Sequence, residues 1–295
     1  MSASPPEVGR PGAVPRRPRV AVVIGSGSVK CAAAIGLLKV LQREGIGIDL
    51  LVGCSGGSIY AALIALGYEP ARTEEMTRKL WTKELTSRRN RVAFLRAFLP
   101  FVPFHERFGL VSDRLIMDRL RTAFGDATFE QARIPLFLTA TDFHNGEQVV
   151  FAKGAIVDAL RASIAIPYVF EPWPVDDRLL VDGFLSDPMP VGVAIKEGAD
   201  VIVTMGFESP YQSKVTSLLR FAFQLSSITS NNLLRANYSF HNLAHHHEII
   251  PIVPQFKERV GLFDTHKIPY VIEEGERAAQ EKLPYIRRLL AATDA

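Results

Sequence analysis

Apolar residues fall along the chain in short runs that alternate with stretches of helical composition. The β-branched run 20–28 ends in glycines and predicts a buried strand that enters a loop, and 31–45 follows with helical composition and a glycine stop. Residues 48–53 predict a second strand and 58–67 a second helix. This repeated order of strand, glycine-rich turn and helix is typical of an α/β fold with a largely parallel sheet.

Later segments continue the pattern. The strand-like run 134–143 is followed by 147–153, and the His-Asn-Gly turn at 144–146 predicts that the two runs pair as a hairpin. Further predicted elements are three strands, at 178–183, 199–207 and 248–254, and a closing helix at 272–292. The prolines of 248–254 favour an edge position in the sheet, and Pro284 predicts a division of the closing helix.

A long insert, about 68–133, separates the second helix from the later strands. Its first part is charged and helical in composition, and over 88–104 arginines alternate with Phe and Leu. Such a segment is typical of an amphipathic flap that contacts a lipid surface. A segment packed on the core with its arginines turned outward explains the composition equally well, so both interpretations stay open. Residues 1–19, rich in Pro, Gly and Arg, predict a disordered tail before a folded domain at 20–295.

Composition narrows the class of protein. The 295 residues, 47% hydrophobic and 22% charged, suit a folded enzyme-sized protein, and the net charge of +3 gives no support for a nucleic-acid partner. Cys31 and Cys54 are not spaced as metal ligands, and no pattern indicates a metal or another cofactor. So few cysteines favour a reduced, cytoplasmic location, and no apolar run is long enough to cross a bilayer. Any membrane contact is expected to be peripheral, at the inner face.

The stretch Gly53-Cys54-Ser55-Gly56-Gly57 presents a serine between a predicted strand and a predicted helix. This G-x-S-x-G pattern in that context predicts a nucleophile elbow, in which glycines admit a sharp turn and a close backbone approach. The N-terminus of the following helix favours developing negative charge. A serine hydroxyl is a weak nucleophile, so a base is expected within hydrogen-bond reach.

Asp182 is the first candidate for that base. It ends an apolar strand directly before a turn at Gly183, which can place it at the carboxyl edge of the sheet, where open α/β folds have their sites. An ordinary Asp-Gly turn would look the same. A conventional Ser-His-Asp arrangement stays open through His266, whereas His241 and 245–247 fit a solvated segment before a strand better.

At this point the sequence resembles a known family. The stretches IGSGSVKCAAAIGLLKVL, GCSGGS, ASIAIPYVFEPWPVDDRLLVDGFLSDPMPV and EEGERAA occur in the order and spacing of bacterial patatin-like phospholipases, over about residues 20–290. The resemblance implies a three-layer α/β fold with helices on both faces of a largely parallel sheet. It also implies a dyad of Ser55 as nucleophile and Asp182 as base, without histidine or metal. The implied activity is that of a serine esterase or lipid acyl hydrolase, phospholipase A-like, which forms an acyl-enzyme.

The resemblance further places an oxyanion and substrate-binding loop at Gly25, Ser26, Gly27, Ser28 and Lys30. Backbone N–H groups stabilise an oxyanion, so serine fits there where φ stays negative. The chain departs from the family pattern at three positions: Cys31 adds a Cβ that can tilt the loop, Phe184 can narrow the acyl pocket, and Asp187 can raise the pKa of Asp182. These departures leave an alternative open, an inactive or weak relative that binds lipid or protein.

Overall fold

The computed structural model describes residues 17–81, 106–111, 113–209, 211–212, 214–244, 248–261 and 264–292. In these ranges the strands are β1 Val20–Ile24, β2 Leu50–Cys54, β3 Leu136–Asp142, β4 Gln148–Phe151, β5 Trp173–Val175, β6 Arg178–Asp182, β7 Val201–Met205 and β8 Glu248–Ile252. The α-helices are α1 Ala33–Arg43, α2 Gly56–Ala65, α3 Pro70–Leu80, α6 Asp113–Phe124, α7 Ile156–Ser163, α8 Val191–Lys196, α9 Leu218–Ala244 and α10 Ile268–Ala292. Short 3₁₀ helices cover Ser28–Ala32, Phe129–Gln131, Gly183–Leu185 and Thr265–Lys267.

The described strands form one sheet in the order β5-β6-β3-β2-β1-β7-β8, with β4 also paired to β3. The pairs β3–β2, β2–β1, β1–β7 and β7–β8 are parallel. The predicted α/β class with a largely parallel sheet is therefore confirmed. So are the antiparallel hairpin of β3 and β4 and the edge position of β8, which carries Pro251.

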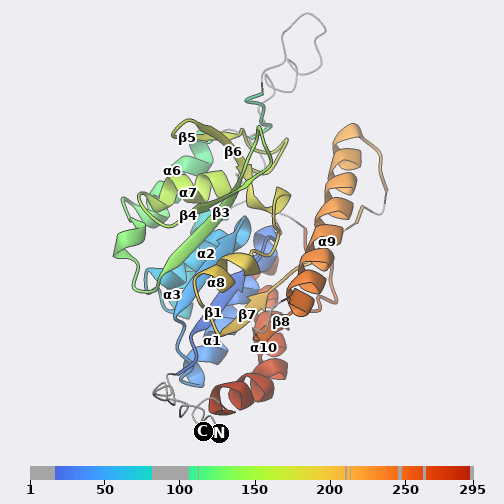
Figure 1. Ribbon diagram of the computed structural model, residues 1–295. Helices are drawn as coiled ribbons and strands as arrows, with labels where there is room; N and C mark the ends of the chain where they lie inside the picture. The colour runs from blue at the N-terminus through green and yellow to red at the C-terminus, as the bar shows by residue number, and fades with distance from the viewer. Residues whose placement is uncertain are drawn as a thin grey trace, which may run out of the picture.

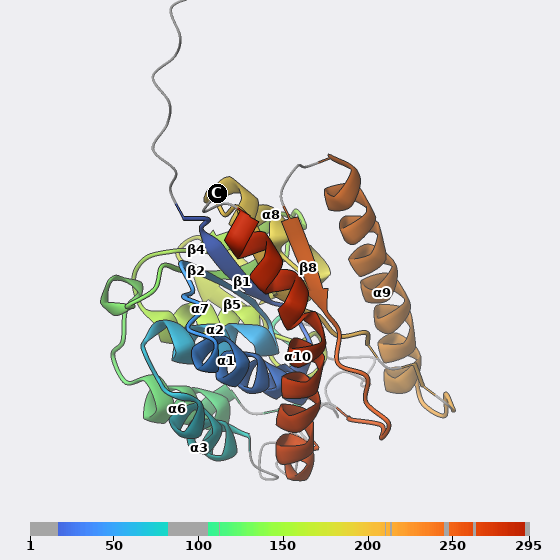
Figure 2. The same ribbon diagram turned by 90° about the horizontal axis from the view of Figure 1, so that it is seen from below.

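Helices cover both faces of this sheet, which gives the three layers that Figures 1 and 2 show. Side chains of β1 alternate between two cores: Val20, Val22 and Ile24 pack with α1, α2 and α10, whereas Ala21 and Val23 pack with α8 and α9. All five are buried, so β1 reads as a continuous apolar run, as expected for a central parallel strand. None of the described helices combines the length and apolarity needed to cross a membrane.

The register of the strands beside β2 decides where Asp182 lies. Cys54, the last residue of β2, pairs with Thr139 of β3, and the next residue, Ala140, pairs with Asp182. Because β6 runs antiparallel to β3, its carboxyl end descends to the level at which β2 ends. Asp182 thus reaches the expected edge of the parallel strands, but it arrives from the opposite direction.

Three features predicted from the sequence differ from the structure. Helix α10 is continuous from Ile268 to Ala292 and includes Pro284, so the predicted division is wrong. His241 is buried in α9 rather than solvated before a strand. The last residues of the predicted tail contact the fold, since Arg17 pairs with Asp49. The amphipathic flap predicted at 88–104 lies outside the described residues.

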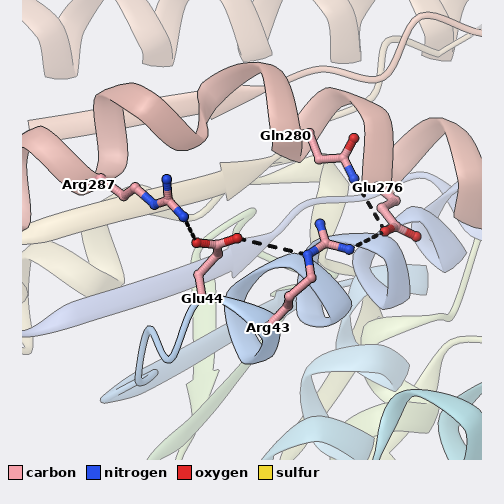
Figure 3. Close-up of polar contacts among 5 residues, drawn as sticks. All are labelled: Arg43, Glu44, Glu276, Gln280 and Arg287. Atoms are coloured by element: carbon pink, nitrogen blue, oxygen red, sulfur yellow. Dashed lines mark hydrogen bonds and ion pairs between the residues drawn. The ribbon is translucent and has the colours of Figure 1, made fainter.

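Helices α1 and α10 lie side by side on one face of the sheet (Figure 2), and two glycines let their backbones approach. A Cβ on Gly36 would lie 2.3 Å from Ile272 O, and a Cβ on Gly275 would lie 2.2 Å from Ala33 O. Ion pairs and hydrogen bonds along the solvent side of this contact link Arg43, Glu44, Glu276, Gln280 and Arg287 (Figure 3). Exposed pairs of this kind stabilise little, so backbone packing at the glycines sets the contact.

We predict that Gly275→Ala lowers the free energy of unfolding by about 1–3 kcal/mol, because the added methyl group cannot fit without moving α10 from α1. The control, Arg43→Ala, removes only exposed polar contacts and is expected to change it by at most about 0.5 kcal/mol. Urea unfolding followed by circular dichroism measures both. Equal effects of the two substitutions would contradict this view of the contact.

Candidate active site

Ser55 occupies the sharp turn between β2 and α2. Its φ of 53° and ψ of −128° fall outside the regions that L-residues usually adopt, as in a strained nucleophile elbow. The turn requires glycine on both sides of Ser55, because a side chain there would clash with the backbone. A Cβ on Gly57 would lie 2.2 Å from Ile24 O, and a Cβ on Gly53 would lie 2.5 Å from Ser58 Cα. The elbow glycines predicted from the sequence are therefore positions where no larger residue fits.

The Ser55 hydroxyl donates a hydrogen bond to Asp182, with Oγ 2.7 Å from Oδ2. Both residues are buried, Ser55 with 4% and Asp182 with 0% of its surface exposed. The other carboxylate oxygen of Asp182 accepts from the Phe184 N–H at 3.0 Å, directly after the Gly183 turn. The structure thus brings the two predicted dyad residues into direct contact, although 127 positions separate them.

Burial raises the pKa of Asp182 from the ordinary 3.8 to about 7, against the lowering effect of the hydrogen bonds from Phe184 N–H and the Ser55 hydroxyl. A carboxylate with this pKa is a far better proton acceptor at neutral pH than a solvated aspartate. Asp187 is not among the causes of the shift, so the effect predicted for it on Asp182 is absent. Instead, Asp187 accepts hydrogen bonds from Met189 N–H and Asn237 Nδ2.

The predicted oxyanion loop lies against the elbow, since a Cβ on Gly56 would lie 2.7 Å from the backbone of Ser28. Two of its donors are already used: Gly25 N–H bonds to Met205 O at 3.0 Å, and Ser26 N–H bonds to Pro188 O at 2.9 Å. Ser28 has a φ of 52°, so the expectation that the loop serines keep negative φ fails there. Such strain in a non-glycine residue is common at functional sites.

A pocket of about 150 Å³ opens at Ser55. Its described lining includes Ser26, Gly27, Ser28, Lys30, Ser55 and Phe184. Four of the five predicted loop residues therefore share a pocket with Ser55, whereas Gly25 does not line it. The Lys30 ammonium donates to Glu208 O at 2.8 Å, and burial lowers its pKa.

Two departures from the family pattern fit into this site without displacing it. Cys31 is fully buried, and its thiol donates to Gly25 O with Sγ 3.3 Å from the oxygen, so its side chain fastens the loop. Burial raises the pKa of that thiol well above its ordinary value, which leaves it protonated and unreactive. Phe184 lines the pocket with its side chain and contacts Asp182 through its backbone.

The sequence analysis did not identify Ser163, which contributes to the site. The Ser163 hydroxyl, fully buried at the end of α7, accepts a hydrogen bond from Ser55 N–H at 2.9 Å, and two residues later Ala165 O accepts from Asp182 N–H at 3.1 Å. The segment 163–165 thus holds the backbones of both dyad residues. In the sequence, its only signal is its place in the ASIAIP stretch at 162–167, which belongs to the family resemblance.

The histidine alternative receives no support from the described residues. The Ser55 hydroxyl donates to a carboxylate, and no described histidine lines the pocket. His266 lies in the 3₁₀ helix Thr265–Lys267, and His241 lies in α9. Residues 245–247 lie outside the described part of the chain.

Comparisons with known proteins identify the family of this chain. A family model described as patatin-like phospholipase matches residues 22–195. An uncharacterized NTE family protein of Mycobacterium tuberculosis is 35% identical over 188 residues, which cover 64% of this chain and 49% of the relative. Human patatin-like phospholipase domain-containing protein 6 is 28% identical over 201 residues, covering 67% of this chain and 14% of the relative.

Among solved structures, VipD from Legionella pneumophila shares the fold, with a TM-score of 0.54 at 14% identity over 92% of this chain and 67% of that one. The family match spans more than half of the chain, so the chain belongs to the patatin-like phospholipase family. The chain spans about half the length of the mycobacterial relative.

We predict that Ser163→Ala weakens the site without removing either dyad residue. The buried Ser55 N–H loses its acceptor, which costs about 1–3 kcal/mol and loosens the strained elbow. The expected results are a lower free energy of unfolding and roughly tenfold slower labelling of Ser55 by a fluorophosphonate. Mass spectrometry of the labelled peptide measures the rate. Ser239→Ala, at an exposed position of α9, is the control, and identical labelling rates would rule out the positioning role.

Proposed function

We propose that this chain is a lipid acyl hydrolase in which Ser55 is the nucleophile and Asp182 the general base. The observation that carries the proposal is the buried hydrogen bond of 2.7 Å between Ser55 Oγ and Asp182 Oδ2. Burial gives Asp182 a pKa of about 7, so a substantial fraction of it is ionised at neutral pH and ready to accept the serine proton.

In the proposed reaction Ser55 Oγ attacks the ester carbonyl carbon while Asp182 takes the hydroxyl proton. The tetrahedral intermediate collapses, the alcohol leaves with that proton, and the acyl group stays on Ser55. Asp182 then takes a proton from water, the hydroxide attacks the acyl-enzyme, and Ser55 leaves with the proton as the free acid is released. The cycle consumes one water and needs no further reactant.

The oxyanion is proposed to lie between the loop and the elbow. Gly25 and Ser26 donate within the fold, so the proposal rests on the N–H of Gly27, which lines the pocket, and on that of Gly56, the first residue of α2. Both donors are at or beside the positive end of α2, where negative charge is favoured. Side-chain identity matters less here than the direction of the backbone, which is why serines in the loop are compatible with the role.

Membership of the patatin-like phospholipase family supports a lipid ester as the substrate class, and phospholipase A-type cleavage is the specific form that we propose. Cytoplasmic location and peripheral contact with the inner face of the membrane remain predictions. The binding-module alternative was motivated by Cys31, Phe184 and Asp187. Two contacts favour the enzyme over this alternative: the Cys31 thiol donates to Gly25 O inside the loop, and Asp187 accepts hydrogen bonds from Met189 N–H and Asn237.

We predict that the purified chain hydrolyses p-nitrophenyl butyrate and lysophosphatidylcholine, and that Ser55→Ala and Asp182→Asn each lower kcat by at least about a thousandfold while the fold is retained. Release of p-nitrophenol or fatty acid measures the rate, and circular dichroism checks the fold. His266→Ala is the discriminating control and should leave the rate unchanged.

Three results would count against the proposal. Normal hydrolysis by Ser55→Ala would remove the nucleophile assignment. Loss of activity in His266→Ala, with Asp182→Asn active, would favour a conventional histidine base. No hydrolysis by the folded wild-type protein would favour the binding module.

A further inference from the structure

A second depression adjoins the pocket at Ser55, between α9 and the turns that precede β5 and follow β6. Its volume is about 470 Å³, and we name it the α9 groove. Its apolar walls include Tyr168, Phe184, Leu185, Phe221 and Leu225. Phe184 and Ser226 line both the groove and the pocket at Ser55, so the two cavities share a wall. No charged side chain belongs to the groove's lining among the described residues.

The groove exposes apolar side chains that a folded protein normally covers. Leu225 is 49%, Phe221 51% and Leu185 42% exposed. Their grouping on one side of α9, next to a nucleophile, is the arrangement expected of a binding site for an apolar ligand.

Backbone strain marks the opposite wall. Tyr168 has a φ of 68°, in the left-handed region where a bulky side chain is rare, and it is 47% exposed. Its carbonyl accepts from Leu110 N–H at 3.1 Å, and Val111 N–H bonds to Val169 O at 2.9 Å, so the insert holds this turn in place. A strained, exposed aromatic residue that neighbouring backbone fixes is typical of a ligand-binding wall.

The size of the groove indicates the kind of ligand. Ligand pockets usually measure about 300–1,000 Å³, so the pocket of about 150 Å³ at Ser55 is small by itself, and the groove of about 470 Å³ brings the combined space into that range. The lining residues of α9 run from Phe221 to Leu233, about 18 Å at a rise of 1.5 Å per residue. One acyl chain spans half of a hydrocarbon core of about 30 Å, or about 15 Å.

We propose that the α9 groove binds the long, unbranched acyl chain of the ester whose carbonyl lies at Ser55. The chain passes Phe184, which both cavities share, and lies along α9, so the groove sets the preference for acyl-chain length. This inference rests on the proposed function, since it assigns the subsite for the acyl part of the same substrate.

The kinetic test compares p-nitrophenyl butyrate with p-nitrophenyl dodecanoate, each at a concentration below that at which the ester aggregates. Leu225→Gln places an amide in the groove at a position that is already exposed, and should lower kcat/KM for the dodecanoate about tenfold while the butyrate rate is unchanged. Leu218→Gln makes the same change on α9 outside the groove, where Leu218 is 70% exposed, and should alter neither rate.

A second pair of variants tests the shape of the groove. Ala222→Trp fills it and should lower the dodecanoate rate selectively, whereas Ala236→Trp, at an exposed position of α9 outside the groove, should not. Thermal unfolding checks that both fold. If Leu225→Gln and folded Ala222→Trp keep the wild-type ratio of dodecanoate to butyrate rates, the proposal is overturned.

A binding measurement separates this inference from the proposed function. In the Ser55→Ala background, the fluorescence of cis-parinaric acid reports fatty-acid binding without turnover. We expect Leu225→Gln to weaken this binding about tenfold and Leu218→Gln to leave it unchanged, even if the wild type hydrolyses no ester. Equal binding by all variants would overturn the proposal. Loss of binding to phosphatidylcholine vesicles, with chain-length preference intact, would make the groove a membrane-docking surface instead and would also overturn it.

Discussion

The site depends on one buried carboxyl group, that of Asp182, which accepts a hydrogen bond from the Ser55 hydroxyl. Asp182 has no exposed surface, and the 2.7 Å hydrogen bond from Ser55 supplies one of its few compensating contacts. Burial raises its pKa from 3.8 to about 7, so the folded protein holds the proton more tightly than the unfolded chain. The free energy of unfolding therefore falls as the pH rises from 3.8 to about 7, and it levels off at higher pH. The ionised base is a cost in stability, which is a recurrent feature of active sites.

Everything around this pair serves to fix it. The antiparallel arrival of β6 beside β3 brings Asp182 to the level at which β2 ends, and the elbow turns Ser55 toward it. The segment 163–165 accepts a hydrogen bond from the backbone N–H of each residue. The missing side chain at Gly56 lets the loop at Ser28 lie directly on the elbow. Apart from the Ser163 hydroxyl, these contacts are made by backbone atoms, so few polar side chains are needed to hold the serine and the carboxylate in place.

The sequence was informative where a local pattern reflects local geometry. Glycines around Ser55 and an apolar strand ending at Asp182 indicated both residues, and strand-helix alternation indicated the α/β class. It failed where long-range contacts decide. Ser163 acts through one hydrogen bond across 108 positions, and no local signal marks it. Helix α9 is rich in Ser and Asn and has weak helix propensity, and long-range contacts of Leu234 and Tyr238 with the sheet hold its C-terminal half. Pro284 fits inside α10 because tertiary contacts override the local preference.

The most direct test of the account is the pH dependence of covalent labelling at Ser55 by a fluorophosphonate, measured as a rate and mapped by mass spectrometry. If Asp182 activates the serine, the rate rises with pH along a single titration curve with a midpoint near 7, the pKa that burial gives Asp182. In Asp182→Asn the curve should flatten and the rate should fall at every pH. A wild-type rate that shows no titration near 7, or a titration that survives in Asp182→Asn, would contradict the central claim.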